Sequence, residues 1–396
     1  MDILTLSSRA GTARPSPTLA LTARANQMKA EGKNVISFGA GEPDFNTPDP
    51  ICDVAVDAIR KGFTKYTPSS GIRELKDAIV AKLARENELK YQPDQIVVSC
   101  GAKHSLYNAL QMLIDPGDEV ILLAPYWMSY YDQVRLAQGV PVVVHGVAEH
   151  NFEPELEAIE AAITKKTRLI MVNSPNNPTG AVYSEPTLRG IAEIATKHNL
   201  WIVSDEIYER LVFNGARHHS MASFGSAALE RTLLIGGCSK TYAMTGWRIG
   251  FTACPLPVAK AMSNFQDQVT SNPSSISQKA AVEAFSMDGP EVENMRREFE
   301  GRRNLAEAEL GKIPGLAVPN PQGAFYFFLN VSQFLGGSVP DDVALSELLL
   351  ERAQIAMVPG SVFDAPGHLR LSYTASRDQI IEGIARLGEA LTSLTA

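Results

Sequence analysis

The stretch TLLIGGCSKTYAMTGWRIGFTA (residues 232–253) places two predicted strands on either side of a short turn rich in small residues. We predict the strands at 232–236 and 248–253, because both are short apolar runs next to turn-forming residues. The turn is too short to hold a crossover helix, so the second strand is expected to run antiparallel to the first. The stretch therefore predicts a sheet that contains one antiparallel strand.

Lys240 lies in that turn, directly after the first predicted strand. A lysine at the end of a buried strand is partly desolvated, and desolvation lowers the pKa of an amine toward neutrality. A Schiff-base lysine needs this change, because only the free amine attacks a carbonyl. The same residues are also consistent with an ordinary surface lysine in a glycine-rich turn. Other parts of the sequence are needed to distinguish the two interpretations.

Short β-rich runs alternate with helical patterns through the middle of the chain, as in HSLYNALQMLI (104–114) and EPTLRGIAEIATKH (185–198). Several of the runs are continuous in Val, Ile and Leu, as expected for strands buried on both faces. The alternation predicts an α/β fold with a mostly parallel, doubly wound, seven-stranded sheet. Its strands are predicted at 95–99, 119–124, 141–146, 168–173, 200–205, 232–236 and 248–253.

The pattern changes around residues 286–290, where a long charged helix begins and strands follow at GAFYFFLNV (323–331) and HLRLSYT (368–374). The start of the chain is rich in turn formers and lacks the alternation of the middle. We predict three parts: an N-terminal arm (1–48) that joins the small domain, a large domain (49–288), and a smaller α+β domain (289–396).

Composition narrows the class of protein. The chain has 396 residues, which exceeds one ordinary core, and a formal net charge of −8, which argues against nucleic acid or an anionic membrane as a partner. It contains no apolar run near the ~18 residues of a membrane span, and its first residues lack a secretory signal pattern. The four cysteines form no CxxC pair. We expect a cytoplasmic enzyme.

Ligands bind at the carboxyl ends of strands in an open α/β sheet, and four predicted strand ends carry polar residues. In SCGAKH (99–104), Gly101 permits a tight turn, and the amides of Ala102 and Lys103 then form an anion site at a helix N-terminus. In NSPNNPTG (173–180), Asn177 can donate its amide to an acceptor. A plain turn explains either motif when it is taken alone.

The other two strand ends are SDEIYE (204–209) and the lysine turn itself. Asp205 can pair with a protonated ring nitrogen, and Tyr208, one helical turn later, can face the same site. The alternative for Asp205 is the N-cap of a helix. Arg248 opens the next predicted strand and can bind a phosphate through two hydrogen bonds.

Together the four strand ends supply a carbonyl-reactive lysine, an acid for a ring nitrogen, donors for a ring oxygen and an anion site. This set matches pyridoxal phosphate, whose pyridinium ring withdraws electrons. The sequence does not support nucleotide, nicotinamide, zinc or serine-hydrolase chemistry. It lacks GxxxxGK and GxGxxG spacing, HExxH, GxSxG and a paired Cys/His set. We therefore predict no metal site.

The chain resembles the class I aminotransferases over residues 14–390, and within them the subgroup of bacterial aspartate aminotransferases that includes prephenate aminotransferases. The resemblance implies the fold-type I fold of pyridoxal-phosphate-dependent transferases and a homodimer with shared active sites. The motifs that carry it are GEPDF, KYTPSSGIRELKDAI, GAKHSLYN, APYW, NSPNNPTGAVY, VSDEIYE, GCSK, TGWRIG, GAFYFF and HLRLSY.

The resemblance also implies roles for single residues around the cofactor. Lys240 would bind the cofactor covalently and move a proton, and Asp205 would pair with the pyridinium nitrogen. Asn177 and Tyr208 would donate to the ring oxygen, and Trp127 would stack on the ring. The phosphate would be bound by the turn at Gly101 with the amides of Ala102 and Lys103, by Ser239 and Arg248, and by Tyr66 reaching across to the partner subunit.

For the substrate, the resemblance implies that Arg370 binds the α-carboxylate, and strand alternation places this arginine opposite its two leucine neighbours. Gly41 would let the arm approach, while Trp127 and Asn177 complete the substrate site. Residues 264–278 contain no arginine for a distal carboxylate. The subgroup uses instead a lysine, here Lys103, with hydroxyl groups such as those of Ser16 and Thr18. His104 departs from the GGKQ of the subgroup.

The function that follows is amino-group transfer between aspartate or glutamate and a 2-oxo acid, 2-oxoglutarate or oxaloacetate, by a ping-pong route in which the cofactor carries the amino group. A prephenate or broader-specificity aromatic aminotransferase is the first alternative, and a lyase, synthase or decarboxylase with the same cofactor is the second. A regulatory protein with an aminotransferase-like domain is disfavoured by the net acidity and by the short stretch before residue 40.

Overall fold

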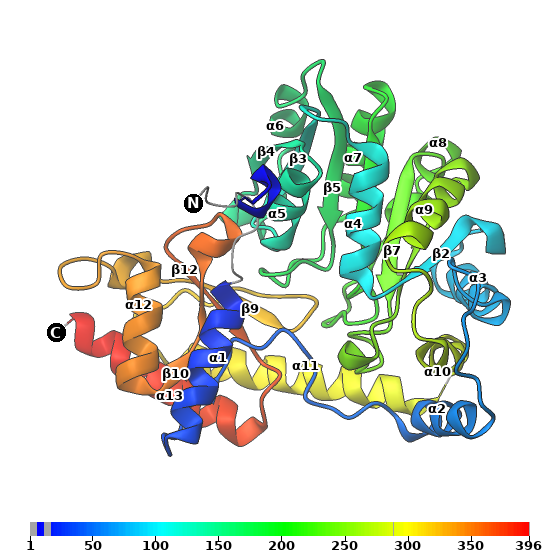
Figure 1. Cartoon of the computed structure of the whole chain (residues 1–396). Helices are drawn as coiled ribbons and strands as arrows, with labels where there is room; N and C mark the ends of the chain where they lie inside the picture. The colour runs from blue at the N-terminus through cyan, green and yellow to red at the C-terminus, as the bar shows by residue number, and fades with distance from the viewer. Residues whose placement is uncertain (1–5, 12–16, 288, 396) are drawn as a thin grey trace, which may run out of the picture.

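The computed structural model of the protein describes residues 6–11, 17–287 and 289–395 (Figure 1). Its centre is a seven-stranded sheet with the order β2-β8-β7-β6-β5-β3-β4. β8 pairs antiparallel with both β2 and β7, and the other neighbours run parallel. The strands are β2 (Ile96–Ser99), β3 (Glu119–Ala124), β4 (Val140–His145), β5 (Thr167–Asn173), β6 (Trp201–Asp205), β7 (Thr232–Gly237) and β8 (Gly250–Ala253).

The predicted sheet is confirmed, including its one antiparallel strand, but β8 begins two residues later than predicted. A 3-10 turn at η5 (Thr245–Trp247) precedes it, and Arg248 has a left-handed backbone with φ of 57°. This conformation lies outside the β region, so Arg248 ends the turn and does not open the strand. The correction matters for the site, because it places Arg248 in the loop that carries Lys240.

Helices cover both faces of this sheet because its strands are apolar on both faces. Val120 and Leu122 of β3 pack with α4, α5 and α9, whereas Ile121 and Leu123 pack on the opposite face with α6, α7 and α8. These helices are α4 (Ala102–Leu113), α5 (Ser129–Leu136), α6 (Leu156–Ala161), α7 (Glu185–Lys197), α8 (Ser226–Leu229) and α9 (Leu256–Val269).

A third apolar cluster lies beside β2 and β8 and joins the sheet to α2 (Asp49–Arg60), α3 (Arg73–Asn87) and α10 (Ser275–Ser286). Its sheet side is built by Val98 and Phe251, and its helix side includes Leu83 of α3. α3 therefore lies next to the strands that flank the lysine turn. The C-terminal end of this helix becomes important below.

The rest of the chain forms a smaller α+β part, seen at the lower left of Figure 1. β12 pairs antiparallel with β9 and β11, and β1 (Ile36–Ser37) of the arm pairs with β10 (Ile355–Ala356). This part contains α11 (Pro290–Leu310), β9 (Tyr326–Asn330), α12 (Asp342–Leu348), a π-helix (Leu349–Ala353), β11 (Val358–Pro359), β12 (His368–Ser372) and α13 (Arg377–Thr395), with α1 (Pro17–Ala30) of the arm packed against it.

The pairing of β1 with β10 agrees with an arm that joins the small domain, while the boundaries at 48 and 288 stay predictions. The remaining short turns are η1 (Ser8–Gly11), η2 (Pro93–Gln95), η3 (Ala148–His150), η4 (Met221–Ser223), η6 (Ser332–Phe334) and η8 (Gly360–Phe363). No helix of the described chain is both long enough and apolar enough to span a bilayer.

Candidate active site

The carboxyl ends of three parallel strands meet at one cavity of about 450 Å³. β5 ends at Asn173 beside Asp205, the last residue of β6, and β7 leads into the turn that carries Lys240. The arm and the smaller part close the other side. The cavity is lined by Thr18, Thr22, Gly39, Ala40, Gly41, Glu42, Ala102, Lys103, Trp127, Met128, Ser129, Tyr130, Asn173, Asn177, Asp205, Ile207, Tyr208, Ser239, Lys240, Thr245, Arg248, Tyr326 and Arg370.

Lys240 is partly buried, and its Nζ donates a hydrogen bond of 2.6 Å to the carbonyl oxygen of Gly41 in the arm. Burial lowers the pKa of its ammonium group to about 8, although the carboxylates of Glu42 and Asp205 act in the opposite direction. An amine with this pKa is partly neutral at physiological pH. Lys240 therefore has the property that the sequence predicted for a Schiff-base lysine.

Asp205 is only 4% exposed, and its Oδ2 accepts a 2.7 Å hydrogen bond from the Tyr130 hydroxyl while its Oδ1 accepts one from the Ile207 amide. Burial raises the pKa of this carboxyl to about 6, and the two hydrogen bonds oppose that rise. The residues after Asp205 form a turn and not a helix. Asp205 is therefore not the N-cap that was its alternative role.

Tyr208 lies in that turn and still lines the cavity with Asp205, although no helix sets their spacing. Its hydroxyl is 2.9 Å from the hydroxyl of Tyr326, which comes from β9. Burial raises the pKa of Tyr208 well above its usual value, so its hydroxyl remains a neutral donor. The expected helical spacing was wrong, but the expected shared cavity is correct.

Arg370 on β12 is 2% exposed and lies among aromatic rings and neutral oxygens. Its Nη1 donates to the Asn177 Oδ1 at 2.9 Å and its Nη2 to the Gly39 carbonyl at 3.0 Å. Its Nε is buried without a hydrogen-bond partner among the described residues. A buried guanidinium with unused bonding capacity is suited to bind the carboxylate of a ligand. Asn177 can still donate through its Nδ2.

The residues predicted to bind an anion lie together where α4 begins. Gly101 precedes the helix with a φ of 87°, and a Cβ at this position would lie 2.4 Å from the Arg248 Nη2. The guanidinium is held by the carbonyl oxygens of Thr245 and Cys100, and Ser239 is buried in the adjacent turn. Glycine is favoured here because its φ of 87° is strained for other residues, and a Cβ would also displace the Arg248 guanidinium from the helix N-terminus.

These features fit pyridoxal phosphate. The anion site suits its phosphate, the buried carboxylate of Asp205 suits a protonated ring nitrogen, and the partly neutral amine of Lys240 suits its aldehyde. Trp127 lies at the same cavity, and the Lys103 Nζ is 4.7 Å from the centre of its ring. The cavity therefore brings together most residues that the sequence singled out, including Thr18 and Gly41.

One predicted residue lies away from the cavity. Tyr66 is 91% exposed and lies outside this cavity, so it has no place in the site of its own subunit. Its predicted role at the site of a partner subunit stays a prediction. Ser16 lies outside the residues that the structure describes.

Sequence reasoning missed several residues of the cavity. Asn173 accepts a hydrogen bond from the Asn177 amide and donates to the Asp205 carbonyl, so it ties two strand ends together. Its position at the end of a strand was the available signal. Tyr130 and Tyr326 gave no such signal, because each looks like an ordinary aromatic residue of a helix or a strand.

Comparisons with known proteins agree with this geometry. The chain is 47% identical to an aspartate aminotransferase of Bacillus sp. (strain YM-2) over 96% of its length and 98% of the relative. It is also 47% identical to a probable aspartate/prephenate aminotransferase of Aquifex aeolicus, over 98% and 99% of the two chains. The crystal structure of the Rhizobium meliloti aspartate aminotransferase superposes with a TM-score of 0.94 at 42% identity, covering 98% and 99%.

The Thermus thermophilus aspartate aminotransferase with maleate superposes with a TM-score of 0.93 at 41% identity, covering 98% of this chain and all of the other. The family model for aminotransferases of class I and II matches residues 33–387. That range includes the lysine turn, the anion site and the buried arginine. The chain therefore belongs to the class I and II aminotransferase family.

Proposed function

We propose that this protein is a pyridoxal-phosphate-dependent aminotransferase that moves an amino group between aspartate or glutamate and a 2-oxo acid, 2-oxoglutarate or oxaloacetate, by a ping-pong route. One observation carries the proposal. A single cavity holds an amine with a pKa near 8, a buried carboxylate and a buried guanidinium with an unused Nε. Membership of the aminotransferase family supports it.

When bound, pyridoxal phosphate supplies an electron sink for the chemistry at the amino-acid Cα. The residues of the chain would hold and orient it. Lys240 would hold it through its Nζ and carry a proton there, while the negative charge of the Asp205 carboxylate would keep the ring nitrogen protonated. Asn177 and Tyr208 would donate to the ring oxygen, and the N-terminus of α4 with Arg248 would hold the phosphate.

Recognition of the substrate falls to two cations that line the cavity, Arg370 and Lys103. Arg370 is fixed by Asn177 and Gly39, so it suits the α-carboxylate, which every amino-acid substrate has. Lys103 lies over Trp127 at the cavity wall, where a second carboxylate can reach it. Relatives named aspartate aminotransferase or aspartate/prephenate aminotransferase support a dicarboxylic substrate.

A prephenate aminotransferase is the second candidate, because relatives 43–47% identical carry that name beside aspartate. The same two cations would serve, since prephenate also has two carboxylates. A lyase on the same cofactor would need no second substrate. The aspartate and prephenate aminotransferases differ only in the 2-oxo acid that accepts the amino group. A screen of acceptors can therefore separate these two candidates.

The experiment is a half-reaction screen on the purified enzyme loaded with pyridoxal phosphate. Aspartate, glutamate, alanine and aromatic amino acids are mixed with it, and the absorbance of the lysine-bound cofactor is followed. Aspartate and glutamate should convert it at least ~10-fold faster than alanine, since an ion pair to a second carboxylate is worth one to three kcal/mol. Prephenate and 2-oxoglutarate are then compared as acceptors that restore the absorbance.

Lys240→Ala is the control for the lysine. It should lose the absorbance of the lysine-bound cofactor and the turnover of aspartate. Full turnover by this variant would refute the proposed function. Equal rates with alanine and aspartate in the wild-type enzyme would refute only the proposed binding of a second carboxylate by Lys103.

The homodimer with shared active sites and the cytoplasmic location belong to the same proposal. Exposed Tyr66 supports the dimer, because its side chain has no place in the cavity of its own subunit. Tyr66→Phe should weaken cofactor binding without changing the sedimentation coefficient of the dimer. A monomeric, fully active enzyme would contradict the shared site.

A further inference from the structure

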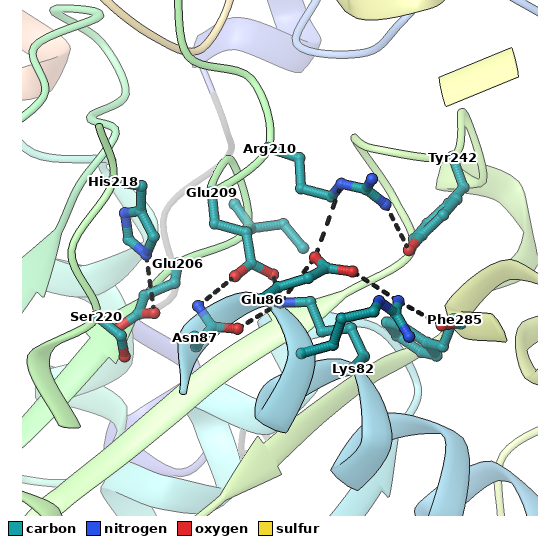
Figure 2. A network of polar contacts seen from close by, with 12 residues as sticks. Lys82, Glu86, Asn87, Glu206, Glu209, Arg210, His218, Ser220, Tyr242 and Phe285 are labelled. Carbon is teal, nitrogen blue, oxygen red and sulfur yellow. Dashed lines mark hydrogen bonds and ion pairs between the residues drawn. The ribbon is translucent and has the colours of Figure 1, made fainter. Parts of the chain in front are cut away.

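A network of polar contacts includes Glu206 and Glu209 (Figure 2), which come from the same segment as Asp205 and Tyr208. Asp205 and Tyr208 line the active-site cavity, whereas Glu206 and Glu209 of the same turn bond to partners outside it. The segment therefore has two sides, one for the site and one for the network. The contacts that hold Glu206 and Glu209 therefore also hold Asp205 and Tyr208, because all four residues lie in one short stretch of backbone.

Glu206 is the first anchor, and it is 1% exposed. Its Oε1 accepts hydrogen bonds from the Ser204 hydroxyl at 2.8 Å, from the Ser220 hydroxyl at 3.0 Å and from the Met221 amide at 3.1 Å. Its Oε2 is 3.0 Å from the His218 Nε2. These contacts tie the residue after Asp205 to the loop 218–221.

Lys82 of α3 is the second anchor, and it is only 1% exposed. Its ammonium contacts the Glu209 Oε1 and also donates to the Asn87 Oδ1 at 2.9 Å. Asn87 in turn donates to the Glu209 Oε2 at 2.9 Å. Burial acts to raise the pKa of Glu209, but Lys82, His218 and Asn87 together outweigh burial, and the pKa is lowered. Lys82 and Asn87 therefore hold the Glu209 carboxylate from two sides.

The same end of α3 also reaches the lysine turn. The Lys82 Nζ is 3.7 Å from Glu86, whose carboxylate is 3.7 Å from the Arg210 guanidinium. Arg210 lies 3.5 Å from the hydroxyl of Tyr242, two residues after Lys240 (Figure 2). We call Lys82, Glu86 and Asn87 the α3 clamp.

We propose that Lys82, through the α3 clamp, is a positioning residue of the active site. It holds the segment 205–210 so that Asp205 and Tyr208 keep their places in the cavity, and through Glu86 and Arg210 it braces the turn of Lys240. The proposal rests on the proposed function, because it assigns Lys82 to the binding of that cofactor. Lys82 itself does not line the cavity.

Glu206, Glu209 and His218 also have the geometry of a cation site, since their ligand atoms lie within 4.8 Å of one another. Their oxygens are already engaged, however. Glu209 is neutralised by the Lys82 ammonium, and Glu206 accepts hydrogen bonds from two hydroxyl groups and an amide. The lysine supplies the positive charge that a metal ion would bring.

The expected effect follows from the low exposure of both charges, 2% for the Lys82 side chain and 13% for that of Glu209. Removing the ammonium alone leaves the Glu209 carboxylate without its cation and with the Asn87 amide as its donor, which weakens a network of this kind. Removing both charges together spares that penalty but also removes the directional contacts that orient the turn. The single variant therefore changes both the stability of the protein and the position of the segment 205–210. The double variant changes the position of that segment.

The test uses the full-length protein with pyridoxal phosphate and compares Lys82→Met with the double variant Lys82→Met/Glu209→Gln. Lys76→Met is the matched control, because Lys76 is also a buried lysine of α3 but donates to Ser70, in the loop before the helix. The readouts are the equilibrium affinity of the apoprotein for pyridoxal phosphate, the pH titration of the absorbance of the bound cofactor, kcat and KM for aspartate, and the thermal unfolding midpoint.

We expect the double variant to unfold near the temperature of the control. It should nevertheless bind the cofactor about 10-fold more weakly, titrate at a pH displaced by about half a unit, and show kcat reduced about 10-fold with KM within about 2-fold of wild type. Lys82→Met should show the same changes and a lower unfolding midpoint.

A double variant whose cofactor affinity, titration and kcat all match those of Lys76→Met would overturn the proposal, even if Lys82→Met fails to fold. That result would leave Lys82 a residue of structural importance only. A wild-type protein that neither binds pyridoxal phosphate nor consumes aspartate would refute the proposed function instead, so the two failures are distinguishable.

Discussion

Asp205→Asn is expected to make the cofactor-free protein more stable at neutral pH. The carboxyl group is 4% exposed and has a pKa of about 6, against an ordinary value of 3.8, because burial penalises the charged form. Asparagine keeps the size of the side chain, its oxygen can accept from the Ile207 amide and its Nδ2 can donate to the Tyr130 hydroxyl oxygen, but it carries no charge. The substitution therefore removes the cost of a buried, ionised group.

The magnitude follows from the two pKa values. The folded state binds more protons at this residue than the unfolded state between pH 3.8 and 6, so the stability contributed by Asp205 falls as the pH rises through that window. Above pH 6 the cost is complete and amounts to about 3 kcal/mol, since each pKa unit corresponds to about 1.4 kcal/mol. At pH 5 it is about half as large, because the folded-state carboxyl is then mostly protonated.

The assay is urea unfolding of the apoprotein at pH 5, 6, 7 and 8, with Asp53→Asn on the exposed surface of α2 as the control. The free energy of unfolding of Asp205→Asn should exceed that of wild type by an amount that grows from pH 5 to pH 7 and is then constant. With the cofactor bound the same variant should lose about 100-fold or more in kcat, because the charge opposite the ring nitrogen is gone.

An Asp205→Asn apoprotein that is equally or less stable than wild type at pH 7 would refute this reasoning. A stability advantage of the same size at every pH would also refute it. Either result would mean that the network around Asp205 favours the ionised carboxylate, and that the site carries no such cost before the cofactor binds.

Three further outcomes are expected. In Arg370→Met, KM for aspartate should rise about 100-fold with the absorbance of the bound cofactor unchanged, because the α-carboxylate loses a charged double hydrogen bond; a KM within 2-fold of wild type would contradict this. In Gly101→Ala, the apoprotein should bind pyridoxal phosphate at least about 10-fold more weakly in equilibrium titrations, since the new Cβ meets the Arg248 guanidinium and the backbone has a φ of 87°. The rate at which the Lys240 amine of the apoprotein reacts with a small aldehyde should rise as the pH rises through about 8 and then level off, and a rise delayed to pH 10 would place the amine in water.

The sheet and its order of elements were largely predictable, because strand and helix patterns are local. Buried strands read as continuous apolar runs, and the short turn around Lys240 could not contain a crossover helix. The boundaries were less certain. The residues from Arg248 onward look like the start of a strand, but Arg248 has a left-handed backbone and β8 begins two residues later.

The candidate site was predictable where residues lie at strand ends, since parallel strands bring their carboxyl ends to the same edge. This rule placed Asn177, Asp205 and Lys240 together. The rule could not predict Tyr130 or Tyr326, because these residues reach the site from other elements. Nor could it show that Asp205 is followed by a turn, because a Tyr three residues after an Asp fits a helix equally well.

By itself, then, the sequence determined the class of fold and identified residues at neighbouring strand ends that gather with Lys240 in one cavity. Only the tertiary structure decided how these groups are tuned and held. The Tyr130 hydroxyl meets Asp205 across 75 residues, and Lys82 meets Glu209 across 127. Burial sets the pKa values, and burial depends on which distant segments pack over a group, which no local pattern of residues can specify.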